Sequence, residues 1–329
     1  MYACGALGAW HRVRNADSLT VVMFHRTLRA DDPRQASCDP DYTLDAGLFA
    51  DSLRFFRRHY HVVSLADVRA AHRGERPLPP RAMLLTFDDG WLDNVDYALP
   101  ALREQGLPAV MFVAADAVGA RQPFYQERII GAFRRGTLSL DRLAAATGVP
   151  ARGTGLDEVR HQIDVLEHLS PAQREALLAP LAPMLDDGLR HMVDVDDLHA
   201  LRAGGVELGL HGKRHIHITR APDPDDELAG ARVALANALD LAPEDAEAAC
   251  GTMSFPHGAF DDALAKRGRE AGYELLFTSV PVLNRVGTGP AWLLGRTGYE
   301  TATVADARGR FQPDRMAWYL FRRPIRRLA

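Results

Sequence analysis

The sequence predicts an α/β protein whose strands form a distorted (β/α) barrel. Short apolar runs alternate with helical stretches of about 10–15 residues, which is typical of parallel strands covered by helices. The chain of 329 residues is long enough to bury one large core. Acidic and histidine residues follow directly after two of the apolar runs. In a parallel barrel, functional side chains gather at these carboxyl ends of the strands.

Eight short apolar runs predict the strands. They are rich in β-branched and aromatic residues, and several are apolar throughout, as expected for strands buried on both faces. The predicted strands are 19–25, 61–64, 82–87, 109–114, 206–210, 253–256, 275–278 and a short one near 292–294.

Helices are predicted between the strands from apolar residues at helical spacing and from capping residues. Asp45 can cap a helix that runs to about residue 60, and Ser64 begins another through a capping box with Asp67. Residues 26–44 are polar, contain two prolines and predict a long loop. Further helices are predicted over 95–106, up to Gly204-Gly205, and over about 261–271.

Residues 120–190 interrupt this alternation with helical patterns and no convincing strand. Ser170-Pro171 is a typical helix start, with serine as the cap and proline at the first helical position. We therefore expect a helical insertion within a single domain that spans 1–329. Such excursions often form lids or substrate walls. The sequence leaves open the alternative that the insertion only covers the outside of the barrel.

Composition argues against several classes of protein. The net charge of −4 gives no global reason to expect nucleic-acid binding. No apolar run approaches the ~18 residues of a transmembrane helix, and the N-terminus lacks the pattern of a secretory signal. Three widely spaced cysteines, Cys4, Cys38 and Cys250, argue against a disulfide framework. These features favour a cytoplasmic location.

The C-terminal residues 315–329 mix aromatic side chains with five arginines. Such a tail can rest on an anionic membrane surface, which would place the protein at the inner face of the membrane. The same residues also fit a docked terminal helix with a solvated basic end, so both interpretations stay open.

Two adjacent carboxylates, Asp88 and Asp89, follow the predicted strand 82–87 directly. Like charges repel, and burying both would cost on the order of several kcal/mol. A bound cation removes this problem, because one aspartate can ligate it while the other stays ionised as a general base. Taken alone, Asp-Asp-Gly is also common in turns and at helix caps.

Two histidines, His211 and His215, follow the predicted strand 206–210. Histidines four residues apart can lie on one face of a helical turn and bind one ion. One carboxylate and two imidazoles leave coordination positions open for water and substrate, which marks a catalytic metal site. Zn²⁺ suits this set best, and Co²⁺, Ni²⁺ or Mn²⁺ could also be accepted.

Three blocks resemble the polysaccharide deacetylases of the NodB-homology group, which are metal-dependent carbohydrate esterases. Residues 86–90 match the T-F-D-D-G motif of that family, and residues 207–215 match its E-[IL]-G-x-H-[ST]-x-x-H motif. Gly212 departs from the second motif, which has Ser or Thr there. The third block is represented by Phe255, Pro256, His257 and Gly258, which would support the site or bind substrate.

The resemblance implies roles for four residues of the first two motifs. Asp88 would be the general base, and Asp89, His211 and His215 would bind the divalent metal. The family usually supplies a catalytic acid from a late histidine motif, and this chain has no histidine after His257.

A circularly permuted branch of the family, which includes the poly-N-acetylglucosamine deacetylases, carries the acid on its first strand. This sequence resembles that branch around His25, which we therefore predict to be the acid, with His257 as its rival. Ser254 stands where some members have an arginine that orients the base, and Arg296 could serve instead.

The predicted function is metal-dependent removal of N-acetyl groups from amino sugars, by one deacetylase-like catalytic domain. The substrate would be an oligo- or polysaccharide, as in exopolysaccharide biosynthesis, or its lipid-linked precursor. Two alternatives are a cyclic imide or ureide amidohydrolase on the same fold, and a catalytically inactive sugar-binding scaffold. The complete predicted ligand set argues against the first, and the retained Asp88 argues against the second.

Overall fold

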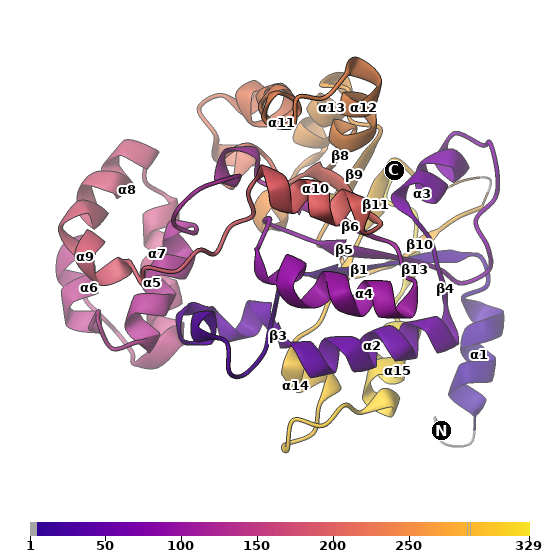
Figure 1. Ribbon diagram of the computed structural model, residues 1–329, viewed down its shortest axis with the longest axis horizontal. Coiled ribbons are helices and arrows are strands. Elements are labelled where there is room, and N and C mark those ends of the chain that lie inside the picture. Colours follow the sequence, from indigo (N-terminus) through magenta and orange to yellow (C-terminus); the bar gives the residue numbers. More distant parts are fainter. Residues whose placement is uncertain (1–4, 288, 290) are drawn as a thin grey trace.

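The computed structural model describes residues 5–287, 289 and 291–329, and shows a curled central sheet surrounded by helices (Figure 1). Cys4 lies outside the described residues, and the two other cysteines, Cys38 and Cys250, are free and buried. No helix among the described residues is long and apolar enough to cross a membrane.

Parallel strands form the centre of the fold and confirm the predicted barrel class. In spatial order they are β1 Ser18–Phe24, β5 Ala82–Phe87, β6 Ala109–Val113, β7 Val206–Leu210, β8 Thr252–Ser254, β9 Leu275–Thr278 and β11 Leu293–Gly295. β12 (Thr297–Gly298) continues from β11 and pairs in parallel with β1. The segment from β11 to β12 therefore connects the two outermost members of this row of parallel strands, β11 and β1.

Apolar residues on both faces explain why these segments form buried strands. Every residue of β5 and β6 is buried. Alternate positions belong to two different hydrophobic clusters, because successive side chains of a strand point to opposite faces. Leu84, Val110 and Phe112 belong to the smaller cluster, whereas Leu85 and Met111 pack in the larger cluster that includes residues of the surrounding helices.

The surrounding helices begin largely where their caps predict. Asp45 caps α2 (Ala46–His59), and Ser64 and Asp67 form the capping box of α3 (Leu65–His72). The helix predicted over 95–106 begins as a π turn, Asn94–Ala98, and continues as α4 (Leu99–Gln105). The remaining helices around the barrel are α10 Val195–Ala203, α11 Ala231–Ala238, α12 Pro243–Cys250 and α13 Asp262–Glu270.

The segment predicted as a long loop, 26–44, contains regular structure. β2 (Arg26–Leu28) pairs in parallel with β3 (Thr43–Asp45), and two short 3₁₀ turns lie between them. Strands of three residues carry too little periodicity to be recognised. Buried polar contacts hold them in place, such as the bond from the Thr27 N–H to the Asp93 carboxylate at 2.9 Å.

Helices occupy the region predicted as an insertion, at the left of Figure 1. They pack around a hydrophobic cluster of their own, which contains Ile129, Val159 and Leu166. Ser170 caps its helix through a capping box, with Pro171 at the first position, as predicted. The helices are α5 Tyr125–Arg134, α6 Leu140–Thr147, α7 Gly155–Glu167, α8 Pro171–Leu178 and α9 Ala182–Leu185.

The two ends of the chain carry elements that the alternation of strands and helices did not predict. The docked terminal helix, one of the two interpretations of residues 315–329, is present as α15 (Pro313–Phe321), which buries Met316, Leu320 and Phe321. The elements not predicted near the chain ends are α1 Ala6–Arg14, β10 Leu283–Arg285, α14 Thr301–Val304 and β13 Ile325–Arg326, with β10 bridging β1 and β13.

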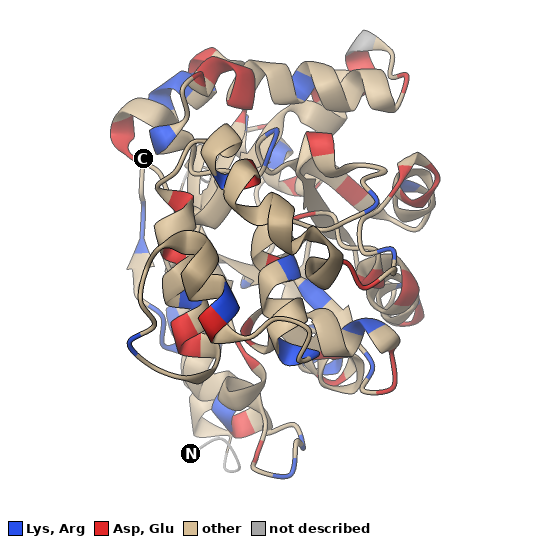
Figure 2. Cartoon of the chain, turned by 90° about the vertical axis from the view of Figure 1, so that its left-hand side faces the viewer, with Lys and Arg blue, Asp and Glu red and all other residues tan. Residues whose placement is uncertain are grey.

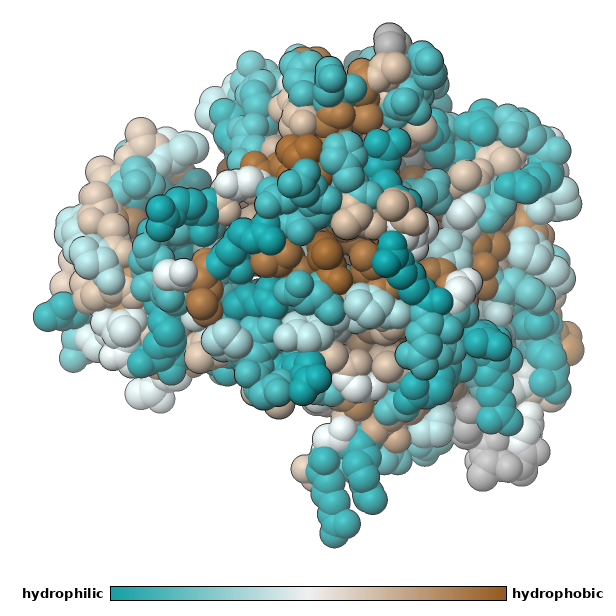
Figure 3. All heavy atoms as spheres, in the orientation of Figure 1, coloured by the Kyte–Doolittle hydropathy of each residue, from teal (hydrophilic) through white to brown (hydrophobic). Residues whose placement is uncertain are grey.

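The face of the molecule seen in Figure 3 is predominantly hydrophilic. Figure 3 shows hydrophilic side chains over most of one face, with hydrophobic residues showing through between α4 and α10. Over the face that carries the insertion, basic and acidic residues are interspersed (Figure 2). This mixture agrees with the small net charge of −4.

Candidate active site

A strained turn at the end of β5 sends two adjacent carboxylates in different directions. Asp89 has φ of 80° and Gly90 has φ of 88°. Aspartate tolerates this left-handed conformation better than most residues, and such outliers cluster at functional sites. A side chain at Gly90 would also place its Cβ 3.1 Å from Val113. The turn therefore requires the glycine, and it lets Asp88 and Asp89 contact different groups.

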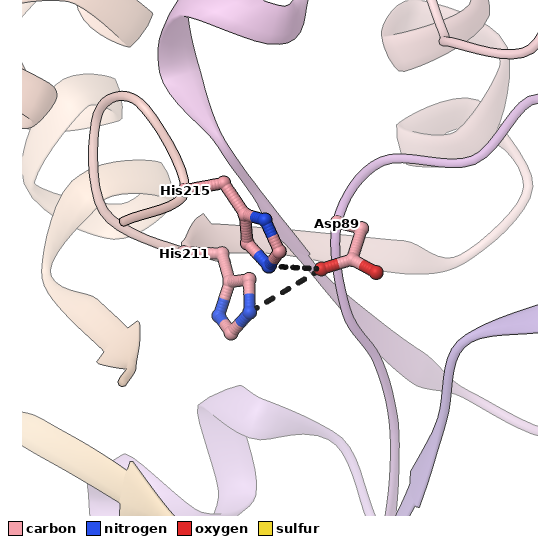
Figure 4. A group of neighbouring side chains, drawn as sticks. All are labelled: Asp89, His211 and His215. Carbon is pink, nitrogen blue, oxygen red and sulfur yellow. Dashed lines mark ion pairs between the residues drawn. The ribbon is translucent and has the colours of Figure 1, made fainter. Parts of the chain in front are cut away.

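Asp89, His211 and His215 converge on one point (Figure 4). Oδ1 of Asp89 lies 3.3 Å from Nε2 of His211 and 3.2 Å from Nε2 of His215. Although it is buried, this oxygen accepts no hydrogen bond of normal geometry from the described residues. We call these three residues the inner group.

The proton on His211 shows why a cation fits the inner group. Nδ1 of His211 lies 3.0 Å from the backbone carbonyl of Ser254, which can only accept, so Nδ1 must donate. Burial lowers the pKa of His211 to about 4, so the ring is neutral and its Nε2 carries a lone pair. A lone pair and a carboxylate oxygen thus face each other, and a divalent cation satisfies both.

Asp88 is held in a buried ion pair beside the inner group. Nη1 and Nη2 of Arg296 each lie 2.7 Å from one of its oxygens, and Nη2 also donates to Oγ of Ser254 at 2.7 Å. Burial alone would raise the pKa of Asp88, but the charge and hydrogen bonds of Arg296, with a contribution from His211, together outweigh it and the net direction is down. Arg296 lies between β11 and β12, in the segment that connects β11 with β1.

One cavity of about 450 Å³ brings the predicted chemistry together. His25 lines it, with its ring edge-on to Tyr42 at a centroid distance of 5.0 Å. Of the third block, Phe255, His257 and Gly258 also line this cavity. The predicted site residues that share its wall are His25, Asp88, Asp89, His211, His215, Phe255, His257 and Gly258.

Pro256 does not line the cavity but lies against Gly212, which explains the departure from the motif there. Gly212 has φ of 68°, and a Cβ there would lie 3.0 Å from Cγ of Pro256. A serine or threonine would therefore meet both backbone strain and a close contact. The glycine shapes the turn between the two histidines without changing their identity.

His257 lies at the edge of the inner group. Its Nε2 lies 3.3 Å from the backbone carbonyl of His215, and its backbone has φ of 57°. Its ring stacks on His217 with centroids 4.2 Å apart. Burial, with smaller contributions from His215 and His217, lowers the pKa of His257 to about 2.

Sequence reasoning missed several residues that hold the site. Nε1 of Trp91 donates to Oδ2 of Asp89 at 2.8 Å, and the Arg26 guanidinium lies 4.4 Å above the Trp91 ring. Trp91 directly follows Asp-Asp-Gly, so its position was a usable signal. Tyr42 and Glu167, which also line the cavity, belong to no motif.

A buried polar network ties the insertion to the barrel beneath Trp91. Arg26 donates to Asp93 at 2.9 Å and to Glu127 of α5 at 2.7 Å. Nη2 of Arg26 lies 3.1 Å from Nδ1 of His191. The side chain of Arg26 is 1% exposed, so these acceptors replace its water.

Comparison with known proteins decides the family. The sequence model of the family described as "Polysaccharide deacetylase" matches residues 75–276, more than half of the chain. This chain belongs to the polysaccharide deacetylase family. The stretch matched includes Asp88, Asp89, His211 and His215, and membership makes the chain an enzyme of that class.

A curated member of the family matches over a short stretch. The poly-beta-1,6-N-acetyl-D-glucosamine N-deacetylase of Escherichia coli (strain K12) is 47% identical over 51 residues. These residues are 16% of this chain and only 8% of that protein.

Solved structures of deacetylases share the fold over nearly the whole chain. IcaB from Ammonifex degensii aligns with a TM-score of 0.58 and 18% identity, over 93% of this chain and 97% of its own. The Streptococcus pyogenes deacetylase PplD, solved in complex with acetate, aligns with a TM-score of 0.57 and 13% identity, over 92% and 98%. At these low identities, the likeness shows only that this chain shares the fold of those deacetylases.

Proposed function

We propose that this deacetylase is a metal-dependent hydrolase that removes N-acetyl groups from amino sugars of an oligo- or polysaccharide, or of its lipid-linked precursor. One observation carries the proposal. A single cavity presents the inner group, an ionised Asp88 held by Arg296, and His25. Metal-dependent amide hydrolysis uses these parts: a cation site, a base and an acid.

Asp89, His211 and His215 would hold the cation, for which Zn²⁺ is the best fit to a mixed nitrogen and oxygen set. When bound, a divalent ion supplies Lewis-acid polarisation of the acetamide carbonyl and makes water more acidic. Trp91 fixes the second oxygen of Asp89, and the Ser254 carbonyl fixes the ring of His211. Such outer partners orient the ligands.

Asp88 and His25 would move the protons. The Asp88 carboxylate takes a proton from the attacking water, while Arg296 and Ser254 hold it in one orientation. His25 then gives a proton to the leaving nitrogen, which departs poorly as an anion. The products are acetate and a free amine.

Polymers of N-acetylglucosamine are the substrates we propose first. The curated relative, by its name, acts on poly-β-1,6-N-acetyl-D-glucosamine, and His25 lies at the end of the first barrel strand, as predicted from the permuted branch. Arg160, Asp164 and Glu167 of α7 line the same cavity. We therefore propose that the insertion is a substrate wall within a single catalytic domain.

A contact of the C-terminal arginines with the inner face of the membrane remains part of the proposal. Arg322 and Arg323 lie over the rings of Trp318 and Tyr319 beside the docked helix α15. Co-sedimentation with anionic and neutral vesicles checks this contact, and cell fractionation checks the proposed cytoplasmic location. Binding only to anionic vesicles would support it.

Acetate release tests the function. Zinc-loaded protein is incubated with β-1,6- and β-1,4-linked N-acetylglucosamine oligomers, beside the variant Asp88→Asn. Release by the unaltered protein alone supports the proposal and separates the linkages. Firm metal binding without release from any oligomer would move the substrate to a lipid-linked or modified sugar. Neither metal nor release would overturn the proposal.

A further inference from the structure

A second cluster of metal-ligating side chains lies beside the inner group. Glu167 ends α7 of the insertion, His217 follows the second motif, and His257 belongs to the third block. One ligand atom from each lies within 4.8 Å of the other two. The rings of His257 and His215 have centroids 4.5 Å apart, so the two clusters are neighbours. We call Glu167, His217 and His257 the outer group.

His257 presents a lone pair to the carboxylate of Glu167. The backbone carbonyl of His215 can only accept, so Nε2 of His257, at 3.3 Å, carries the ring proton. In the neutral ring, Nδ1 is therefore an acceptor, and it lies 4.0 Å from Oε1 of Glu167. Two acceptors face each other, as they do in the inner group.

The separation of these two acceptors suits a bridging ion. Zinc binds imidazole nitrogen at about 2.0–2.1 Å and carboxylate oxygen at about 2.0–2.2 Å. Two such bonds at a tetrahedral angle place their atoms about 3.4 Å apart, so an ion would draw Nδ1 of His257 and Oε1 of Glu167 together from 4.0 Å. Gln126 is a weak competitor for this oxygen, because its Nε2 lies 3.4 Å away.

His217 supplies the third ligand atom. Its Nε2 lies 2.9 Å from Oε2 of Glu167, so it now donates a proton to that oxygen. To ligate an ion through Nε2, the ring must adopt the other tautomer, with its proton on Nδ1. The stacked rings, 10° from parallel, must also turn so that both lone pairs point at one ion.

The exposed fractions of the three side chains agree with a site that an ion can enter. The side chains of His217, Glu167 and His257 are 20%, 16% and 17% exposed. They are thus largely sheltered and still reachable from solvent.

We propose that Glu167, His217 and His257 form a second divalent-cation site, suited to Zn²⁺, at the wall of the active-site cavity. The three ligands come from the insertion and from two loops of the barrel, so a bound ion would tie α7 to the barrel. Because Glu167 and His257 line the cavity, the ion would also take up part of the space open to substrate.

Zinc stoichiometry tests this site independently of deacetylation. Tag-free full-length protein is saturated with ZnCl₂, dialysed and analysed for bound zinc. We expect two ions in the unaltered protein, one in Glu167→Gln, one in His211→Ala and none in the double variant. His168→Ala is the matched control, because His168 neighbours Glu167 but bonds to Asp164 and Arg220 instead. It should keep two ions.

Hydrogen exchange of α7 gives a second readout, which needs no substitution at Glu167 and so does not depend on whether Glu167→Gln folds. In His211→Ala, adding ZnCl₂ should slow exchange at the C-terminal end of α7, because only the outer group remains to bind zinc. Equal zinc content in the unaltered protein and Glu167→Gln would overturn the proposal. So would α7 exchange that zinc leaves unchanged. Failure of deacetylation alone would bear only on the inner group.

Discussion

The inner and outer groups have the same composition, one carboxylate and two histidines, but differ in what holds them. In the inner group all three residues come from turns that end β5 and β7, and their side chains are 3–12% exposed. The outer group takes its carboxylate from α7 of the insertion and is 16–20% exposed. The barrel fixes the first, whereas the second depends on how the insertion rests on the barrel.

This difference predicts different chemistry for similar ligands. The inner group lies beside Asp88, whose carboxylate Arg296 holds at 2.7 Å, so an ion there has a base next to it. Among the described residues, no comparable ionised carboxylate held by an arginine is seen at the outer group. We therefore expect the inner ion to serve the reaction and the outer ion to connect the insertion with the barrel.

The largest effect is expected from His211→Ala. It removes one inner ligand and should abolish zinc binding there, with deacetylation falling by about 10³-fold or more. Zinc analysis and acetate release measure both effects. The outer group should keep its ion, since its residues are untouched. Substantial remaining activity, with His168→Ala as the normal control, would show that the inner group is not the catalytic centre.

Asp88→Asn should separate binding from turnover at the inner group. Asparagine keeps the shape of the side chain but cannot take a proton, so acetate release should slow by about 10²–10⁴-fold. Bound zinc should be unchanged, because Asp88 is not a member of the inner group. A fall in zinc content equal to that of His211→Ala would instead make Asp88 a ligand.

His25→Ala and His257→Ala compare the two histidines that could act as acid. If His25 protonates the leaving nitrogen, its loss should slow turnover by about 10²–10⁴-fold while leaving inner zinc in place. His257→Ala should cost less turnover and should remove the outer ion. The reverse ranking in kcat would transfer the acid role to His257.

Motifs at strand ends are the reason that the inner group could be predicted. The bounds predicted for β5, β7 and β9 agree with the structure, because apolar runs end there in polar turns. Asp89 and His211 follow two of these strands, and parallel pairing brings such ends to one rim. The match to the family motifs then predicted the role of each of these residues.

The outer group had no such signal. Glu167 is one of many acidic residues of the insertion, and only the packing of α7 against the barrel brings it to His257. Tyr42 was missed for the same reason, because it lies in a segment that the sequence predicted as a long loop and reaches the cavity only through the packing of the fold. Terminal elements such as β13 were also missed, since two residues carry no periodicity. Contacts made by distant segments depend on the whole fold.

The smallest effects should come from the residues that hydrogen-bond to the carboxylates of the two groups, Asp89 and Glu167. Trp91→Phe keeps a ring beneath Arg26 but removes the 2.8 Å bond to Asp89, so zinc affinity of the inner group should fall by about 10–100-fold. Gln126→Ala removes only a 3.4 Å contact to Glu167, which is near the limit of a hydrogen bond. Its effect on the outer ion should therefore be smaller.

Competition with a chelator gives both affinities. It is measured in Glu167→Gln for the inner ion and in His211→Ala for the outer ion. A larger loss from Gln126→Ala than from Trp91→Phe would mean that the outer carboxylate, not the inner one, depends on its support.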